Sequence, residues 1–110
     1  MKFPQVVNQN MSDVAISRNG VRIRLTDERW SHIVEEHREL ADLRLEVLEA
    51  INSPVRIVEG GEGALLAVRE IDLGKYLVVV YRESANDGFV ITAFLTRRIR
   101  ILERRKQLWP

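Results

Sequence analysis

Apolar positions between residues 27 and 41 follow the spacing of an amphipathic helix. One stripe carries apolar side chains at i, i+3, i+4 and i+7, which is typical of a helix with one face toward a core. Thr26 suits the N-cap of this helix, and Asp27 and Glu28 suit the positive end of its dipole. The stripe, which is expected to end near Asp42, consists of Trp30, Ile33, Val34, His37, Leu40 and Ala41.

The pattern after Asp42 predicts a second helix and then strands. Asp42 can cap the helix, and Pro54 ends it. Gly-containing turns separate the strands, which predicts an antiparallel meander. Ahead of the helices, residues 21–25 alternate apolar and basic side chains, as a half-buried or edge strand does. The meander strands are expected over residues 55–59, 64–71, 76–83 and 89–96, with the nearly all-apolar third strand at the centre.

These elements predict an α+β fold. Two N-terminal helices are expected to pack on one face of a four- to five-stranded antiparallel meander sheet. Residues 1–20 are polar enough to form a loosely docked arm, and residues 21–110 are expected to form one domain. The tail, residues 97–110, favours a strand to about Ile99 and then a short basic helix, and a strand extension stays open.

Composition excludes several classes of protein. The chain has 110 residues, 45% of them hydrophobic, which is enough for a single core. It has no cysteine, so disulfides, thiolate nucleophiles and cysteine-based zinc sites are excluded. No apolar run approaches the length of a membrane span, and the N-terminal residues lack the apolar segment of a signal peptide. We therefore expect a cytoplasmic protein with no membrane association.

The net charge of +1 conceals a segregation of charge along the chain. Residues 97–110 hold six of the 17 basic residues but one of the 16 acidic residues. In contrast, residues 26–51 hold eight acidic and three basic residues. One side of the fold is therefore expected to be acidic, and the C-terminal end is expected to meet phosphates or an acidic protein.

The two histidines have different expected surroundings. The helical pattern directs His37 toward the core and His32 to the opposite, solvated face near Glu35. A histidine on an apolar face is either a hydrogen-bonded core residue or part of a site, and both interpretations stay open. The histidines are five residues apart, unlike the HExxH spacing of zinc helices, and no carboxylates have EF-hand spacing. We expect no metal and no cofactor.

Three polar side chains interrupt apolar rows of the predicted strands: Arg69, Tyr81 and Thr92. Taken singly, Arg69 can be a surface cation, Tyr81 an aromatic side chain that packs on the sheet, and Thr92 an ordinary strand residue. Antiparallel neighbours could also bring them to His37 where the helix crosses the sheet. An imidazole, a guanidinium, a phenol and a hydroxyl suit metal-free cleavage of RNA, in which a base removes the 2′-hydroxyl proton and a cation stabilises the phosphorane.

The same stretches carry a family resemblance. A helical unit with His-x4-His precedes Val-Arg-Glu, Tyr-Leu-Val-Val-Val-Tyr-Arg-Glu and Val-Ile-Thr-Ala-Phe. Over roughly residues 21–102 this arrangement resembles the barnase, EndoU, colicin and RelE-like (BECR) nuclease superfamily, especially its small phage and mobile-element members. The resemblance implies a metal-independent ribonuclease site containing His37, Arg69, Tyr81 and Thr92.

Two functions from different classes are therefore expected. The first is a metal-independent endoribonuclease, a toxin or phage-derived effector, for which a cognate inhibitor or antitoxin protein would be a further partner. The second is a noncatalytic module of the same fold that binds a protein or a nucleic acid. Convergence of the predicted catalytic side chains in an open cleft would favour the first. The ribonuclease would contact RNA through the basic tail, and the module would bind its protein or nucleic-acid partner through the same tail. The basic residues of the tail are Arg97, Arg98, Arg100, Arg104, Arg105 and Lys106.

Overall fold

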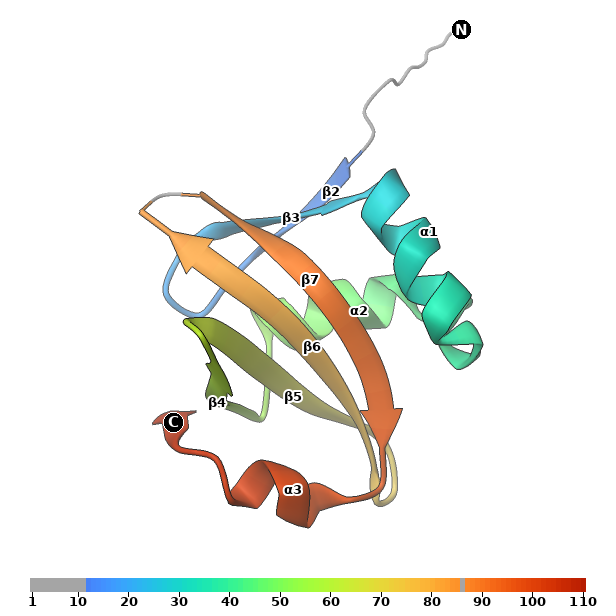
Figure 1. Cartoon of the computed structure of the whole chain (residues 1–110). Coiled ribbons are helices and arrows are strands. Elements are labelled where there is room, and N and C mark those ends of the chain that lie inside the picture. Colours follow the sequence, from blue (N-terminus) through green and yellow to red (C-terminus); the bar gives the residue numbers. More distant parts are fainter. Residues whose placement is uncertain (1–11, 86) are drawn as a thin grey trace, which may run out of the picture.

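The computed structural model describes residues 12–85 and 87–110, which form one sheet with three α-helices (Figure 1). The helices are α1 (Asp27–Glu36), α2 (Arg44–Asn52) and α3 (Ile99–Glu103), and a short 3-10 helix, η1 (Arg38–Leu40), follows α1. The strands are β2 (Ser12–Ile16), β3 (Arg22–Thr26), β4 (Arg56–Gly61), β5 (Ala64–Asp72), β6 (Lys75–Ser84), β7 (Asp87–Thr96) and β8 (Gln107–Trp109).

Among the described residues, the sheet has seven strands in the order β2-β3-β7-β6-β5-β4-β8. Strands β4 to β7 form four consecutive antiparallel neighbours, and β6 lies in the middle of the sheet. β3 joins β7 in parallel, whereas β2 pairs with β3 and β8 with β4 in antiparallel fashion. The sheet is therefore mixed, with one parallel pair.

The predicted fold of two N-terminal helices on a four- to five-stranded antiparallel sheet is wrong. Residues 12–16, which fall in the predicted arm, form β2, and the tail contributes β8 after α3. Residues 1–11 of that arm lie outside the described residues. The alternation in residues 21–25 indicated a strand, which the structure places at 22–26, but the partner and direction of that strand depend on long-range docking onto β7.

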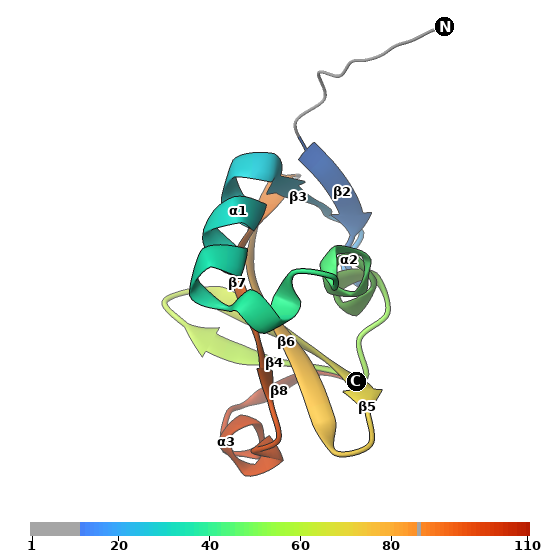
Figure 2. The same cartoon turned by 90° about the vertical axis from the view of Figure 1, so that its right-hand side faces the viewer.

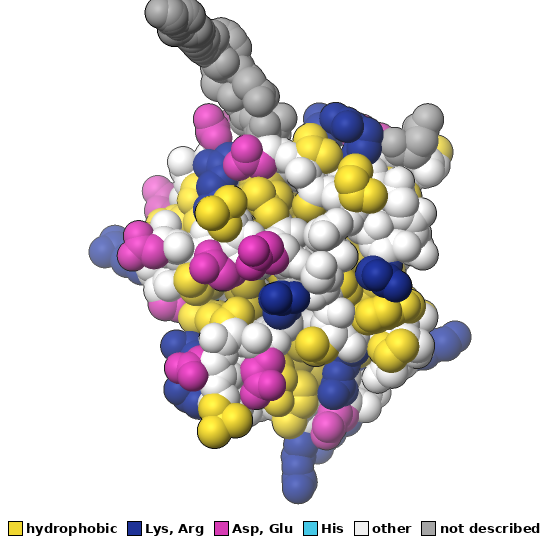
Figure 3. Space-filling view, turned by 180° about the vertical axis from the view of Figure 1, so that it is seen from behind, with side chains coloured by type: hydrophobic (Ala, Val, Ile, Leu, Met, Phe, Trp, Pro, Cys, Tyr) yellow, Lys and Arg dark blue, Asp and Glu magenta, His cyan; other side chains and the backbone are white. Residues whose placement is uncertain are grey.

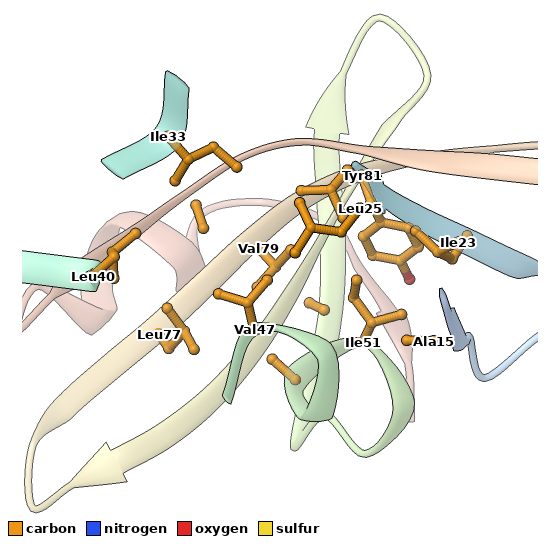
Figure 4. Close-up of a cluster of buried hydrophobic side chains, with 14 residues drawn as sticks. Ala15, Ile23, Leu25, Ile33, Leu40, Val47, Ile51, Leu77, Val79 and Tyr81 are labelled. Atoms are coloured by element: carbon orange, nitrogen blue, oxygen red, sulfur yellow. The ribbon is translucent and has the colours of Figure 1, made fainter. Parts of the chain in front are cut away.

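One face of the sheet, here called the inner face, packs against α2. It carries the buried side chains of Leu77, Val79 and Tyr81 from β6. From α2, Val47 and Ile51 enter the same cluster of fully buried side chains (Figure 4). Burial of these apolar side chains is the main favourable term in the stability of the domain.

α1 runs beside the part of β7 that β3 does not reach (Figure 2). It begins as expected, since Thr26 Oγ1 accepts a hydrogen bond of 3.0 Å from the Arg29 N–H. It ends at Glu36, well before Asp42. His37 leaves the helical conformation at φ −135° and ψ 76°, which places its side chain outside the predicted stripe.

The opposite face, here called the outer face, carries Val78, Val80 and Arg82 of β6. α3 covers one end of it, because Leu102 packs with Val78 and neighbouring apolar side chains in a second buried cluster. The other end, near the β6–β7 turn, retains exposed side chains, and it lies far from α3 in Figure 1. This exposed end of the outer face is the part of the sheet most open to a ligand.

The two ends of the strand order approach one another at one corner of the molecule. The Arg18 guanidinium, in the β2–β3 turn, lies 4.4 Å from the centre of the Trp109 ring in β8. A cation over an indole face at this distance is attractive. The sheet is therefore strongly curled, with α2 on its inner side.

Candidate nucleic-acid interface

The four side chains predicted to form a catalytic site do not converge. Tyr81 and Arg69 lie on the inner face, where Tyr81 pairs with Leu65 and Arg69 with Leu77. Four residues of β5 therefore separate them, or about 13 Å along the strand. The Arg69 Nη1 group donates a 2.5 Å hydrogen bond to the carbonyl oxygen of Ser53 at the end of α2. This contact gives Arg69 a structural role in holding α2 on the sheet.

Tyr81 is a core residue. Its side chain is fully buried, and Figure 4 shows it among Ile23, Leu25 and Ile51. Its hydroxyl has no hydrogen-bond partner among residues 12–85 and 87–110. Burial raises the pKa of the phenol above its ordinary value, and the carboxylate of Glu83 raises it further. A buried phenol with a raised pKa is poorly suited to donate a proton to a substrate.

His37 and Thr92, in contrast, both lie toward the outer face, where the hydroxyl of Thr92 is buried and has no hydrogen-bond partner among the described residues. Thr92 pairs with Val80 and Phe94 with Val78, which places both β7 residues on the outer face. The His37 ring lies 6.5 Å from the Phe94 ring, centre to centre, and Phe94 is two residues from Thr92. The structure thus separates the predicted set into two pairs on opposite faces of the sheet.

His37 is a partly exposed histidine at the border of the outer face. Its side chain is 32% exposed, and its Nδ1 lies 3.8 Å from a carboxylate oxygen of Glu39. It is therefore neither sealed in the core nor aimed at the centre of the sheet. His32 lies on the exposed surface beside Glu35, at 3.9 Å, as the helical pattern predicted.

A row of three side chains crosses the open end of the outer face. Arg24 of β3 pairs with Phe89 of β7, and Phe89 pairs with Arg82 of β6. Residues that are direct partners on neighbouring strands project to the same face, with their Cβ atoms about 5 Å apart. Phe89, although aromatic, is 43% exposed. We call Arg24, Phe89 and Arg82 the cross-strand row.

The neighbouring chain segments hold both arginines of the row. Arg24 forms an ion pair of 3.1 Å with Asp87, two residues before Phe89 on β7. The Arg82 Nη1 group donates a 2.6 Å hydrogen bond to the carbonyl oxygen of Glu62 in the β4–β5 turn. Gly63 leaves space for this guanidinium, because a Cβ there would lie 2.9 Å from Nη1. Each arginine keeps further N–H donors for a ligand.

Arg29, in the first turns of α1, adds a third cation beside the row. Together with Arg24 and Phe89 it borders a hollow of about 180 Å³ between β3, β7 and α1. That volume is below the range of about 300–1,000 Å³ that is usual for metabolite pockets. The hollow therefore suits a single group of an extended ligand better than a whole small molecule.

Arg22 completes what we call the basic outer patch, which comprises Arg22, Arg24, Arg29, Arg82 and Phe89. Arg22, Arg24 and Arg29 are exposed. Within the part of the chain that the structure describes, the one ion pair of these arginines is that between Arg24 and Asp87. The patch therefore presents uncompensated positive charge, which attracts polyanions.

The predicted RNA-contacting residues of the tail are also accessible. All six are exposed, and Arg97 and Arg98 border a hollow at the start of α3. Two of them are partly engaged, because Arg97 reaches the Leu73 carbonyl oxygen and Arg105 that of Glu59. Since Leu102 of α3 packs on the outer face, the tail supplies a second group of cations at the end of the sheet opposite the β6–β7 turn.

The helix side of the molecule has a mixed surface. Acidic side chains are spread over it among Lys, Arg and apolar side chains (Figure 3). A hollow of about 490 Å³ lies along α1 and is lined by Trp30, Val34 and Glu35 among others.

Sequence reasoning missed the residues of the basic outer patch. The alternation of residues 21–25 did place Arg22 and Arg24 on one side of a strand. Nothing in that alternation shows that β3 docks beside β7, so the proximity of Arg24 to Phe89 could not be predicted. The same is true of Arg82, which reads as an ordinary charged residue at the end of a strand.

Comparison with known proteins does not indicate a family or a function for this chain. No protein-family model, no curated protein and no solved structure matches this chain. The resemblance to BECR nucleases therefore stays a prediction. In residues 12–85 and 87–110, no helix has the length and apolar content needed to cross a membrane, and no cluster of His, Cys, Asp or Glu is arranged to hold a metal ion.

Proposed function

We propose that the protein binds RNA across the outer face of its sheet. The observation that carries the proposal is the cross-strand row, in which Phe89 lies between two arginines on an exposed sheet surface. Arginine donates several N–H groups in a planar fork that matches phosphate oxygens. Aromatic side chains on an open sheet are a recurrent platform for RNA bases.

Charge supports a fixed orientation of the RNA. The basic outer patch lies near the β6–β7 turn and the cations of the tail lie near α3, so positive charge borders both ends of the outer face (Figure 1). Residues 26–51, which include α1 and α2, hold eight acidic and three basic residues, and this excess of negative charge would repel the same phosphates. A strand of RNA would therefore cross the outer face between these two groups of cations.

Endoribonuclease activity is the second candidate function. It is favoured by the position of His37, a partly exposed imidazole beside Phe94 at the edge of the proposed RNA path. As general base, His37 would remove the 2′-hydroxyl proton, and the 2′-oxygen would attack the phosphorus and displace the 5′-oxygen of the next nucleotide, which takes up a proton from water. The products would be a 2′,3′-cyclic phosphate and a 5′-hydroxyl. Arg69 and Tyr81 have no part in this version of the mechanism.

The test compares one substitution on each side of the molecule. Arg29→Gln removes a charge from the basic outer patch, and Arg38→Gln removes the same charge from the hollow on the helix side. Both arginines are exposed, so neither change should unfold the protein. We expect Arg29→Gln, measured with a fluorescent single-stranded RNA, to weaken binding and Arg38→Gln to leave it unchanged.

The triple variant Arg22→Gln/Arg24→Gln/Arg29→Gln should weaken RNA binding more than Arg29→Gln alone. The affinity for a single strand falls with salt, and each phosphate contact contributes about 0.7 to the slope of log K against log salt concentration. Loss of three contacts should therefore reduce the magnitude of this slope by about 2. Replacing Arg104, Arg105 and Lys106 together tests the tail in the same way. Equal weakening by Arg29→Gln and Arg38→Gln, or no binding by the wild type, would contradict the proposal.

The same incubations test cleavage. Wild-type protein with a mixed RNA pool, with and without chelator, should yield 2′,3′-cyclic phosphate ends if the second candidate function holds. His37→Ala should then lose activity by about 10²- to 10⁴-fold, while His32→Ala loses little. Binding without cleavage would leave RNA binding as the function and reject the nuclease.

A further inference from the structure

We propose that Phe89 is a stacking platform for one unpaired base, which makes the outer face selective for single-stranded RNA. This inference rests on the proposed RNA-binding function and specifies the form of RNA that the same surface accepts. It concerns a residue that the charge argument alone does not require.

The position of Phe89 leaves its aromatic ring accessible. It is 43% exposed, whereas the flanking residues of β7, Gly88 and Val90, are buried. The outer cluster beneath α3 includes Phe94 of the same strand, and Phe89 is not among its members. A phenyl ring that remains accessible on a sheet surface has a free face for a planar partner.

The surroundings of Phe89 favour a nucleotide over an apolar partner. Arg24 and Arg82 are its direct partners on the two neighbouring strands, so each guanidinium can reach a phosphate on either side of a stacked base. Arg29 borders the same hollow as Phe89. An apolar partner would leave these cations without anionic neighbours, apart from Asp87 on Arg24. Nucleotides offer a π-face and a phosphate at the required proximity.

Stacking explains why single strands would be preferred. In a duplex the base faces are covered by their neighbours, and the A-form groove gives side chains little access to them. An unpaired base can turn its face to Phe89 while its phosphates meet the arginines. Duplex RNA would retain the phosphate contacts alone.

The experiment uses the full chain and two RNAs of equal length, one single-stranded and one duplex, each labelled with fluorescein. Phe89→Ala should weaken binding to the single strand by about 5- to 150-fold, the range for loss of one stacked base. Its effect on the duplex should be less than twofold. Phe89→Tyr should restore binding because it restores the ring, and Phe89→Leu should not.

Ile16→Ala is the matched control. Ile16 lies on β2, pairs with Arg22 and is also 43% exposed, but it has no aromatic ring. It should leave both affinities unchanged. A single-stranded RNA containing 2-aminopurine gives a direct readout, because stacking on Phe89 should quench its fluorescence in the wild type and not in Phe89→Leu.

The outcomes separate this inference from the proposed function. Weakening by the triple arginine variant with no effect of Phe89→Ala would overturn the stacking role and leave RNA binding intact. Equal losses for single-stranded and duplex RNA would also overturn it. If the wild-type protein binds neither RNA, both proposals fail.

Discussion

The two faces of β6 place polar side chains in different environments. On the inner face, Tyr81 is enclosed by the core and its hydroxyl lacks a partner among the described residues. On the outer face, Arg82, the next residue along the chain, reaches the β4–β5 turn and borders an exposed surface. Adjacent residues of one strand thus have opposite environments, because successive side chains project to opposite faces.

The difference shows which surface is free to bind a ligand. α2 and the β2–β3 hairpin cover Tyr81 on the inner face, so a substrate could reach Tyr81 only by opening the core. α3 is five residues long and covers only one end of the outer face. The proposed binding surface therefore lies where helical cover ends.

The largest effect is expected from truncating the inner core. Ile51→Ala removes a fully buried side chain of α2 and should lower the free energy of unfolding by about 2–5 kcal/mol. Phe89→Ala, on the outer face, should cost about 1 kcal/mol or less. Urea denaturation followed by circular dichroism measures both. Similar losses for the two variants would mean that the outer face is as much a core as the inner face.

Gly88→Ala should have the next largest effect. A Cβ at Gly88 would lie 2.5 Å from the Arg82 carbonyl oxygen and 2.6 Å from Cδ1 of Ile23. The strands β3, β7 and β6 would have to separate, which should cost about 1–3 kcal/mol. Thermal melting gives the measurement, and Ser84→Ala, at an exposed position at the end of β6, is the control. An unchanged melting temperature would show that the junction between β3 and β7 is loose.

Tyr81→Phe should stabilise the protein by about 1 kcal/mol, because it removes a buried hydroxyl that lacks a partner in the described part of the chain. Since the pKa of Tyr81 is raised in the folded state, the phenol ionises first in the unfolded chain. Its contribution to stability is complete below about pH 10 and declines as the pH rises further, by up to about 1.4 kcal/mol per pH unit.

The stabilisation by Tyr81→Phe should therefore grow above about pH 10, as urea titrations at several pH values would show. Tyr76→Phe removes a hydroxyl from the outer face and is the control. RNA binding by Tyr81→Phe should equal that of the wild type. Loss of binding by the folded variant would argue against a core role for Tyr81.

The smallest effect is expected at the corner where the sheet edges meet. Arg18→Gln removes the cation above Trp109 and should lower stability by about 0.5–1 kcal/mol. A double-mutant cycle with Trp109→Leu isolates the pairwise energy. A coupling energy of zero would show that the curl of the sheet does not depend on this contact.

Parts of the candidate site could be read from local pattern. The cap at Thr26, the solvated position of His32 and the exposed cations of the tail follow from residue type and spacing within a few positions. The end of α1 could not be predicted in this way, because the apolar spacing continues past Glu36 while the backbone leaves the helical conformation at His37. That turn moved the predicted base from the core to the border of the outer face.

The sequence by itself determined the alternation of side chains along the strands. From this alternation it follows that Arg22 and Arg24 share one side of their strand. It also follows that Arg69 and Tyr81 each share a face with apolar neighbours. Only the tertiary structure decided which of those faces is covered and which strands adjoin. Register, the parallel docking of β3 on β7 and the bulge between Val80 and Tyr81 are long-range choices. They depend on burial summed over several elements, which no local pattern specifies.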